Sequence, residues 1–225
     1  MDLHKPHAAK TWREFFVELG TVVIGILIAL GLEQAVEQVH EHQLAREAHE
    51  AIVAEMQEDL DRVAYRLSQQ PCIDRRIGEI TGLLSDWKDG KAPPPGLDIG
   101  DPGDPPEVDQ RWQANLNSGR FSREPPAEQA EQASFYTSLA ILLDMGRREH
   151  YAWSQLRTLE LQSVLTPDLR PGLIGALQEA RTDASDIRQL GQDVVNKSRR
   201  AGLSPRAFRV TAIAGSTCGP LRKAS

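Results

Sequence analysis

One stretch of this chain, residues 15–32 (FFVELGTVVIGILIALGL), is apolar enough to leave water, and it limits what the remainder can fold into. No charged residue lies between Glu18 and Glu33, which leaves 14 uncharged residues in a row. As a helix these would extend about 21 Å, and all 18 residues about 27 Å, against a hydrocarbon core of ~30 Å. The pattern therefore predicts a single transmembrane helix over residues 15–32.

Two other interpretations compete with a membrane anchor. Residues 1–14 are basic enough for the charged region of a signal peptide, and residues 29–31 (Ala-Leu-Gly) have the composition of a cleavage site. Against cleavage, Glu18 interrupts the apolar region and the helical pattern continues past Gly31. A buried helix of a soluble protein fits less well, because the stretch has no polar face.

The charges on the two flanks predict the orientation. The leader has three Lys or Arg residues against Asp2, whereas the exit side begins with Glu33, Glu37 and Glu41. Positive residues stay on the cytoplasmic side of a membrane. We therefore expect a cytoplasmic leader at residues 1–14, and residues beyond 33 outside the bacterial inner membrane, in the periplasm.

Small residues recur every four positions within the apolar stretch. Thr21, Gly25 and Ala29 would lie along one face of the helix, and such small-residue faces let two helices approach closely in lipid. This predicts either homo-oligomerisation or contact with a protein partner through the transmembrane helix. Small residues are also common in spanning helices without any such role.

The charge distribution argues against nucleic acid as a partner. The formal charge is −6, yet seven basic and no acidic residues follow Asp193, and residues 1–13 add +2, so residues 14–193 hold −15. An acidic body is the opposite of a nucleic-acid-binding footprint. The basic tail at residues 202–225 could lie on anionic lipid headgroups, on the acidic helices, or free in water.

The chain has two cysteines, Cys72 and Cys218. Their spacing excludes a CxxC redox or zinc motif, and in an oxidising compartment they could form one disulfide. The sequence leaves open whether they pair.

Apolar residues at spacings of three and four predict long helices for the remainder. The strongest run starts near Asp168 and continues from Leu173 to Val194. Together these helices predict an all-α fold, in which the transmembrane helix continues into an antiparallel helical bundle over residues 33–201. The expected segments are a rod over 33–70 stopped by Pro71, helices over 73–87, 111–118, 126–166 and from 168, a loop or linker over 88–109, and a short strand or irregular segment at 208–213.

Two segments resemble a known family. The anchor EFFVELGTVVIGILIALGLEQAVE with the later EMQEDL, and the pattern RWQANLNSGRFSREPP…ASFYTSL, are similar to an uncharacterised bacterial family of single-span membrane proteins with a helical extracytoplasmic domain. The resemblance implies a membrane anchor and a helical extracytoplasmic domain. It implies no catalytic residue.

Few residues indicate chemistry. Glu37 and His40 have the Glu-x-x-His spacing of metal-binding bundles, close to Glu33, Glu41, His42 and His49, but a second such pair is missing from the sequence. Trp112, Tyr136 and Trp153 could line a ligand pocket or be core residues. The acidic run Glu55, Glu58, Asp59 and Asp61 is typical of the solvated face of a helix.

From these patterns we expect neither a cofactor nor a metal, and no enzymatic activity. The favoured interpretation is a non-enzymatic interaction or accessory subunit of a membrane assembly, with membrane lipid and a protein as its partners. The alternative is a ligand-sensing periplasmic bundle that signals through a partner.

Overall fold

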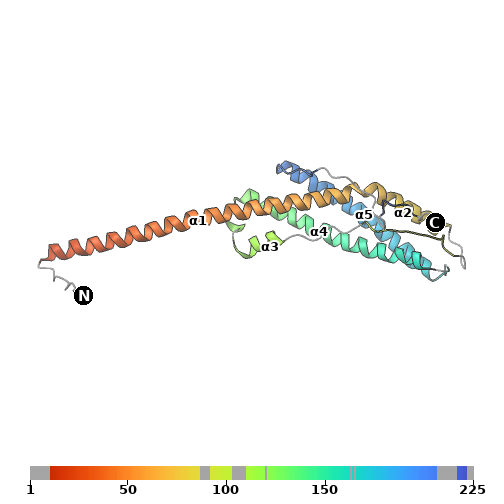
Figure 1. The fold of residues 1–225 in the computed structure, drawn as a ribbon, viewed down its shortest axis with the longest axis horizontal. Coiled ribbons are helices and arrows are strands. Elements are labelled where there is room, and N and C mark those ends of the chain that lie inside the picture. Colours follow the sequence, from red (N-terminus) through yellow and green to blue (C-terminus); the bar gives the residue numbers. More distant parts are fainter. Residues whose placement is uncertain are drawn as a thin grey trace. The chain divides into compact units, whose positions relative to one another are not determined.

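The computed structural model describes residues 11–86, 92–102, 110–119, 121–162, 164, 166–206 and 217–221. Within these ranges no β-strand element occurs, so the all-α prediction is confirmed (Figure 1). The segment proposed as a strand, 208–213, lies outside the described residues. The elements are α1 (Trp12–Ser68), α2 (Gln70–Ser85), α3 (Gln110–Asn117), the 3₁₀ helix η1 (Phe121–Arg123), α4 (Pro126–Leu156), the 3₁₀ helix η2 (Arg157–Leu161) and α5 (Leu169–Arg200).

The chain divides into two compact units, Met1–Glu50 and Ala51–Ser225. The described part of the first unit is the beginning of α1, and all twelve Phe, Val, Leu and Ile side chains of residues 15–32 are exposed there, by 45–69%. Among the described helices, this is the one long and apolar enough to cross a membrane, with a mean hydropathy of 2.4. Val36 and Val39 are also exposed, and the buried face of α1 begins at Ile52.

The predicted rod ends at Ser68, close to the expected residue 70, and Pro71 belongs to the next helix. The chain leaves α1 at Ser68, passes through Gln69 and enters α2 at once, with Pro71 in the first turn of α2. A proline is tolerated there because the first amide groups of a helix have no intrahelical partner. The amides of Cys72 and Ile73 both donate to the Gln69 carbonyl, at 2.9 and 3.1 Å, and start the new helix.

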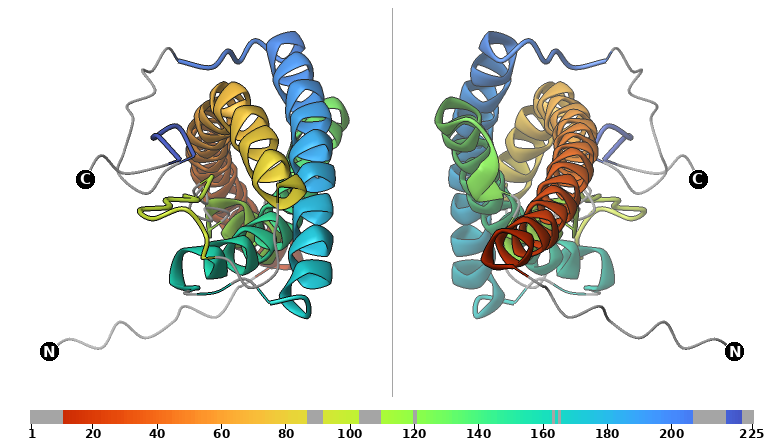
Figure 2. Two further views of the ribbon diagram at one scale, coloured as in Figure 1. Left: turned by 90° about the vertical axis from the view of Figure 1, so that its right-hand side faces the viewer. Right: turned by 90° about the vertical axis from the view of Figure 1, so that its left-hand side faces the viewer.

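The second unit contains two hydrophobic clusters. One joins α1, α3, α4 and α5, and the other joins α2, the loop at 97–99, the end of α4 and α5. Helix α5 packs along both α4 and α2 (Figures 1 and 2). The apolar positions predicted on α5 are buried, apart from the partly buried Leu190, because a 3.6-residue repeat places all of them on one face. Buried members from the other helices include Ile52, Leu60, Ile73, Ile80, Leu139 and Trp153.

Gly191 marks a close approach between α5 and α1. A Cβ atom at this glycine would lie 3.1 Å from Leu67 Cδ2 and 3.4 Å from Val63 Cγ1. Tightly packed interiors accommodate an added methyl group only by displacing neighbours. The glycine therefore sets how closely these two helices pack.

One helix boundary differs from the predictions, and one apolar residue of α3 is exposed. Helix α4 ends at Leu156, not near residue 166, and continues as η2. Because side chains three residues apart eclipse in a 3₁₀ helix, Leu156 and Leu159 both reach the core, where they are 0% and 1% exposed. In α3, Leu116 is 39% exposed and Asn115 is buried instead, where its amide donates to Glu124 Oε1.

The loop predicted over 88–109 contributes to the core. Within its described part, residues 92–102, Leu97 is 9% and Ile99 0% exposed, and both belong to the cluster around Trp153. The Ile99 amide donates to Glu160 Oε1 at 2.7 Å. This segment is thus an ordered part of the second unit.

Candidate functional site

The small-residue stripe lies on the exposed part of α1 in the first unit. Thr21 donates its hydroxyl to the Val17 carbonyl of the same helix at 2.8 Å, so its side chain leaves no polar group pointing outward. A Cβ atom added to Gly25 would meet nothing within 4 Å. Thr21, Gly25 and Ala29 are all exposed, which leaves their face open to lipid or to another helix.

The residues considered as metal ligands lie further along the same unit. Glu33, Glu37, His40, Glu41 and His42 are all exposed, and they follow one another along a single helix. Glu149 and His150, which are adjacent in the sequence, point to different partners. Glu149 is buried against Arg66, and His150 pairs with Asp101 at 2.9 Å.

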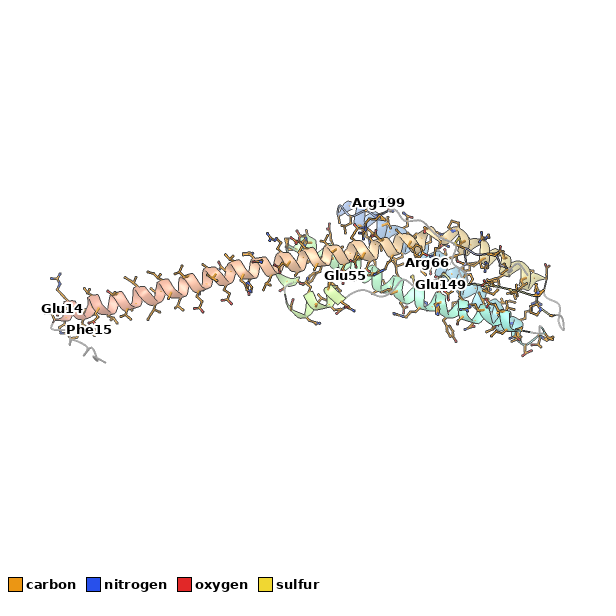
Figure 3. The ribbon with its side chains drawn as sticks, viewed as in Figure 1. Glu14, Phe15, Glu55, Arg66, Glu149 and Arg199 are labelled. Atoms are coloured by element: carbon orange, nitrogen blue, oxygen red, sulfur yellow. A yellow bond between two sulfur atoms is a disulfide. The ribbon has the colours of Figure 1, made fainter. Side chains whose placement is uncertain are left out.

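A polar network, buried at Arg66 and Glu149 and exposed at Asp74 and Arg188, connects four helices of the second unit. Glu149 of α4 receives two hydrogen bonds from Arg66 Nη2, at 2.6 and 2.8 Å, and the two side chains point toward each other (Figure 3). Arg66 Nη1 then donates to Gln70 Oε1 at 3.2 Å, and Gln70 to Asp74 Oδ1 at 2.8 Å on α2. Asp74 finally pairs with Arg188 of α5 at 3.4 Å. The network fixes the mutual register of α4, α1, α2 and α5.

Burial destabilises the charged form of two acidic side chains near this network. Burial raises the pKa of Glu149, and the guanidinium of Arg66 counteracts part of the increase. Asp183 of α5 behaves in the same way, because burial raises its pKa while Arg148, at 3.3 Å, opposes the shift. The paired arginines keep these acids compatible with a largely apolar interior.

The acidic run on α1 is not a solvated face, contrary to our prediction. Glu55 is 0% and Asp59 2% exposed. The Glu55 carboxylate accepts hydrogen bonds from the amides of Arg111 and Trp112, at 2.8 and 3.0 Å, and from the Tyr136 hydroxyl at 2.8 Å. A carboxylate at the first amides of a helix satisfies donors that otherwise lack partners. Glu55 therefore holds the start of α3 against α1 and α4.

Asp59, one turn further along α1, is the most perturbed acid. Burial raises its pKa to about 7, with Arg62 opposing the increase and Glu55 adding to it. Arg62 donates to Asp59 Oδ1 at 2.9 Å, whereas Oδ2 is buried without a hydrogen-bond partner in the described part of the chain. Below about pH 7 the protonated form is consequently favoured in the folded protein.

This raised pKa makes stability depend on pH. Because the folded-state pKa exceeds the unfolded value of 3.8, the folded protein binds more protons between pH 4 and 7, and its stability falls as pH rises through that interval. We expect Asp59→Asn to remove this slope and to raise the free energy of unfolding at pH 8 by about 1–3 kcal/mol. Denaturant unfolding at pH 5 and pH 8 measures both effects. Asp144→Asn, on an exposed acid, is the matched control, and equal slopes for Asp59→Asn and wild type would contradict the prediction.

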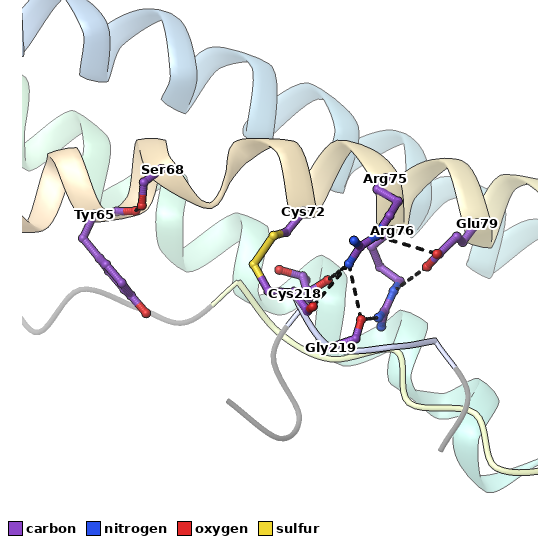
Figure 4. Close-up of a disulfide and its surroundings, with 9 residues drawn as sticks. Tyr65, Ser68, Cys72, Arg75, Arg76, Glu79, Cys218 and Gly219 are labelled. Atoms are coloured by element: carbon purple, nitrogen blue, oxygen red, sulfur yellow. Dashed lines mark hydrogen bonds and ion pairs between the residues drawn. A yellow bond between two sulfur atoms is a disulfide. The ribbon is translucent and has the colours of Figure 1, made fainter. Parts of the chain in front are cut away.

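A covalent and polar clip holds residues 217–221 to α2 (Figure 4). The structure joins Cys72 and Cys218 by a disulfide, with their Cα atoms 4.8 Å apart. The guanidinium of Arg76, which is 0% exposed, donates to the carbonyls of Asp98 and Ile99, and to that of Gly219 at 2.7 Å. One arginine thus connects α2, the 97–101 loop and the C-terminal segment.

The three aromatic residues proposed for a pocket separate into two groups. Trp112 and Tyr136 stack with their ring centroids 4.5 Å apart, and both line a cavity of about 270 Å³. Trp153 belongs to the other hydrophobic cluster, so the three residues share no pocket, and all three are buried in the core, the second of the two interpretations. A larger cavity of about 390 Å³ lies between α4 and α5, with Met56 of α1 at its wall. No sequence pattern indicated this cavity, because its lining comes from three helices and mixes apolar, small and charged residues.

No protein-family model, curated protein or solved structure matches this chain. The resemblance to a family of single-span membrane proteins therefore stays a prediction. The functional argument depends on the exposed apolar helix and on the geometry of the second unit.

Proposed function

We propose that this protein is a single-pass membrane protein, anchored by residues 15–32, that acts as a non-enzymatic accessory or interaction subunit of a membrane assembly. The supporting observation is the exposure, by 45–69%, of every large apolar side chain in that stretch. Twelve such side chains on all sides of one helix form an apolar surface that water tolerates poorly. Within a helix the backbone hydrogen bonds are already satisfied, so lipid can cover this surface.

The disulfide supports a location outside the cytoplasm for the second unit. Disulfides persist in oxidising compartments and are rare in the bacterial cytoplasm. This agrees with the charge asymmetry around the anchor, which favours a cytoplasmic leader and a periplasmic position for the residues beyond 33. In this proposal the protein belongs to the bacterial inner membrane.

The contacts with partners would come from two surfaces. The stripe of Thr21, Gly25 and Ala29 offers a face for a second transmembrane helix, from another copy or from a different protein. The acidic rod over residues 33–70, with exposed Glu33, Glu37 and Glu41, would present the other surface to a protein partner. We propose that the second unit is an antiparallel helical bundle of α4, α5 and the end of α1. The buried acids of this unit are used in helix packing, which favours a structural role over catalysis.

The anchor can be tested by placing charges in its centre. Ile24→Lys combined with Ile26→Lys should move the protein from the membrane pellet to the soluble or degraded fraction, because each lysine costs about 2.5–3.5 kcal/mol at the centre of a spanning helix. Alkaline extraction of membranes, followed by immunoblotting, measures the distribution. Ile141→Lys with Ile174→Lys is the matched control, since these isoleucines are 45% and 39% exposed on α4 and α5. Equal distributions for the two double variants would refute the anchor.

Orientation and cleavage need a separate measurement. A reporter enzyme that is active only outside the cytoplasm, fused after residue 225, should be active. The intact mass of the membrane-extracted protein should include residues 1–31, which a signal peptidase would have removed. A mass beginning at residue 32 would instead establish the signal-peptide interpretation.

A further inference from the structure

The cavity between α4 and α5 has the composition of a ligand site, and nothing in the anchor proposal uses it. Its volume is about 390 Å³, within the range of about 300–1,000 Å³ typical of small-molecule pockets. Apolar side chains form much of the wall, among them Met56, Phe135 and Val194, which are 5%, 7% and 1% exposed. Replacing water at such a wall with an apolar molecule is favourable, because it removes apolar surface from water.

A hydroxyl group in this wall lacks a partner. Ser198 of α5 is 3% exposed, and within the described part of the chain its Oγ makes no hydrogen bond. A buried polar group without a partner is costly, so a ligand that satisfies it gains affinity. Ser134 and Ser138, both on α4, line the same cavity from the facing helix.

The charges at the mouth of the cavity are balanced. Lys197 pairs with Asp193 at 2.8 Å, and the other two charged lining residues, Glu131 and Arg200, have opposite signs. The site therefore has no excess of charge with which to select an anion or a cation. A neutral ligand fits this lining best.

We propose that this cavity binds a small neutral amphiphile, with an apolar body in contact with Met56, Phe135 and Val194 and one hydrogen-bonding group at Ser198. An engineered apolar cavity of about 150 Å³ holds benzene, so by proportion this one holds up to about 16 non-hydrogen atoms. The inference concerns the second unit alone and is independent of the membrane anchor.

The probes are 1-naphthol and naphthalene, which differ by one hydroxyl group. Both should bind the full-length protein in amphipol, with 1-naphthol binding about two- to tenfold more tightly because of one hydrogen bond. Probe fluorescence titrations give the dissociation constants. Ala130→Trp, which places an indole at the cavity wall, should abolish binding of both, whereas Ala127→Trp, on the same helix but outside the lining, should leave both unchanged.

Ser198→Ala separates recognition by the hydroxyl from binding by the apolar wall. This substitution should leave the affinity for naphthalene unchanged. It should lower the affinity for 1-naphthol two- to tenfold, to that for naphthalene. Subtracting the Ala130→Trp titration removes probe taken up by the polymer. If wild type and Ala130→Trp bind the probes equally, the cavity is not a binding site. If 1-naphthol keeps its advantage in Ser198→Ala, the role assigned to Ser198 is wrong.

Discussion

Glu149→Ala should lower the free energy of unfolding by about 3–5 kcal/mol. The substitution removes the carboxylate that receives two hydrogen bonds from Arg66 Nη2, and it leaves a guanidinium that is 6% exposed without its counter-charge. Removing one member of a buried ion pair is among the most destabilising single changes, because the remaining charge stays desolvated. Denaturant unfolding followed by far-UV circular dichroism at pH 7 measures the loss.

Two further variants show whether the loss comes from the unpaired charge. Replacing both partners, Arg66→Met with Glu149→Leu, should recover most of the stability, since apolar side chains can replace a buried pair at little cost. Glu50→Ala removes one member of the exposed Arg46–Glu50 pair, whose side chains are 74% and 69% exposed, and should cost less than about 1 kcal/mol. A loss below 1 kcal/mol for Glu149→Ala would contradict the assigned role of the network.

Cys72→Ala combined with Cys218→Ala should also destabilise the protein strongly. The disulfide joins residues 146 positions apart, and the loop-closure relation for that length gives about 5 kcal/mol of stabilisation through the unfolded state. The Arg76 contacts to Asp98, Ile99 and Gly219 remain in the variant, so residues 217–221 should still dock in the folded state. We therefore expect a loss of about 2–5 kcal/mol with an unchanged helical signal.

Reduction of the wild-type protein provides the matching measurement. Dithiothreitol should lower the unfolding midpoint of wild type to that of the double variant, and should leave the double variant itself unaffected. Arg76→Met then tests the polar half of the clip, because in the reduced protein it should make residues 217–221 accessible to limited proteolysis. Identical midpoints for oxidised and reduced wild type would show that the disulfide contributes nothing.

The long helices could be predicted because their signal is local. The apolar residues of α5 repeat at the helical period, and that repeat alone determines which face is buried. The start of α4 at Pro126 and the end of α3 before Gly119, whose φ is +70°, follow from the local preferences of proline and glycine. The exposed apolar helix is equally local, because eighteen consecutive residues define it.

The buried acids could not be predicted, because their burial depends on partners far away in the sequence. Glu55 looks like a solvated residue in the sequence, yet it accepts hydrogen bonds from the distant amides of Arg111 and Trp112 and from the hydroxyl of Tyr136. Asp59 is buried beside it, with Arg62 of the same helix as its hydrogen-bond partner. Burial of an acid becomes tolerable only when such partners exist, and spacing along one helix does not reveal them. The pair of Arg66 and Glu149, separated by 83 positions, was hidden for the same reason.

The loop at 97–101 and the 3₁₀ helix η2 were missed because tertiary contacts override weak local signals. Leu97 and Ile99 are two apolar residues in a segment rich in proline and glycine, and a pattern this short predicts no element. Their burial depends on the cluster around Trp153 and on the hydrogen bond from the Ile99 amide to Glu160. The cavity near Ser198 could not be predicted for the same reason, because it forms only where α1, α4 and α5 pack together.

The disulfide between Cys72 and Cys218 has a consequence for the order of events during synthesis. A nascent chain acquires structure from its N-terminal end, at roughly 5–20 residues per second. Cys72 therefore waits as a single thiol for several seconds until Cys218 is made, while helix α2 can already form. During this interval an oxidant could couple Cys72 to a thiol of a neighbouring molecule. Oxidation that precedes completion of the chain should thus yield covalent dimers, and delayed oxidation should yield the closed monomer.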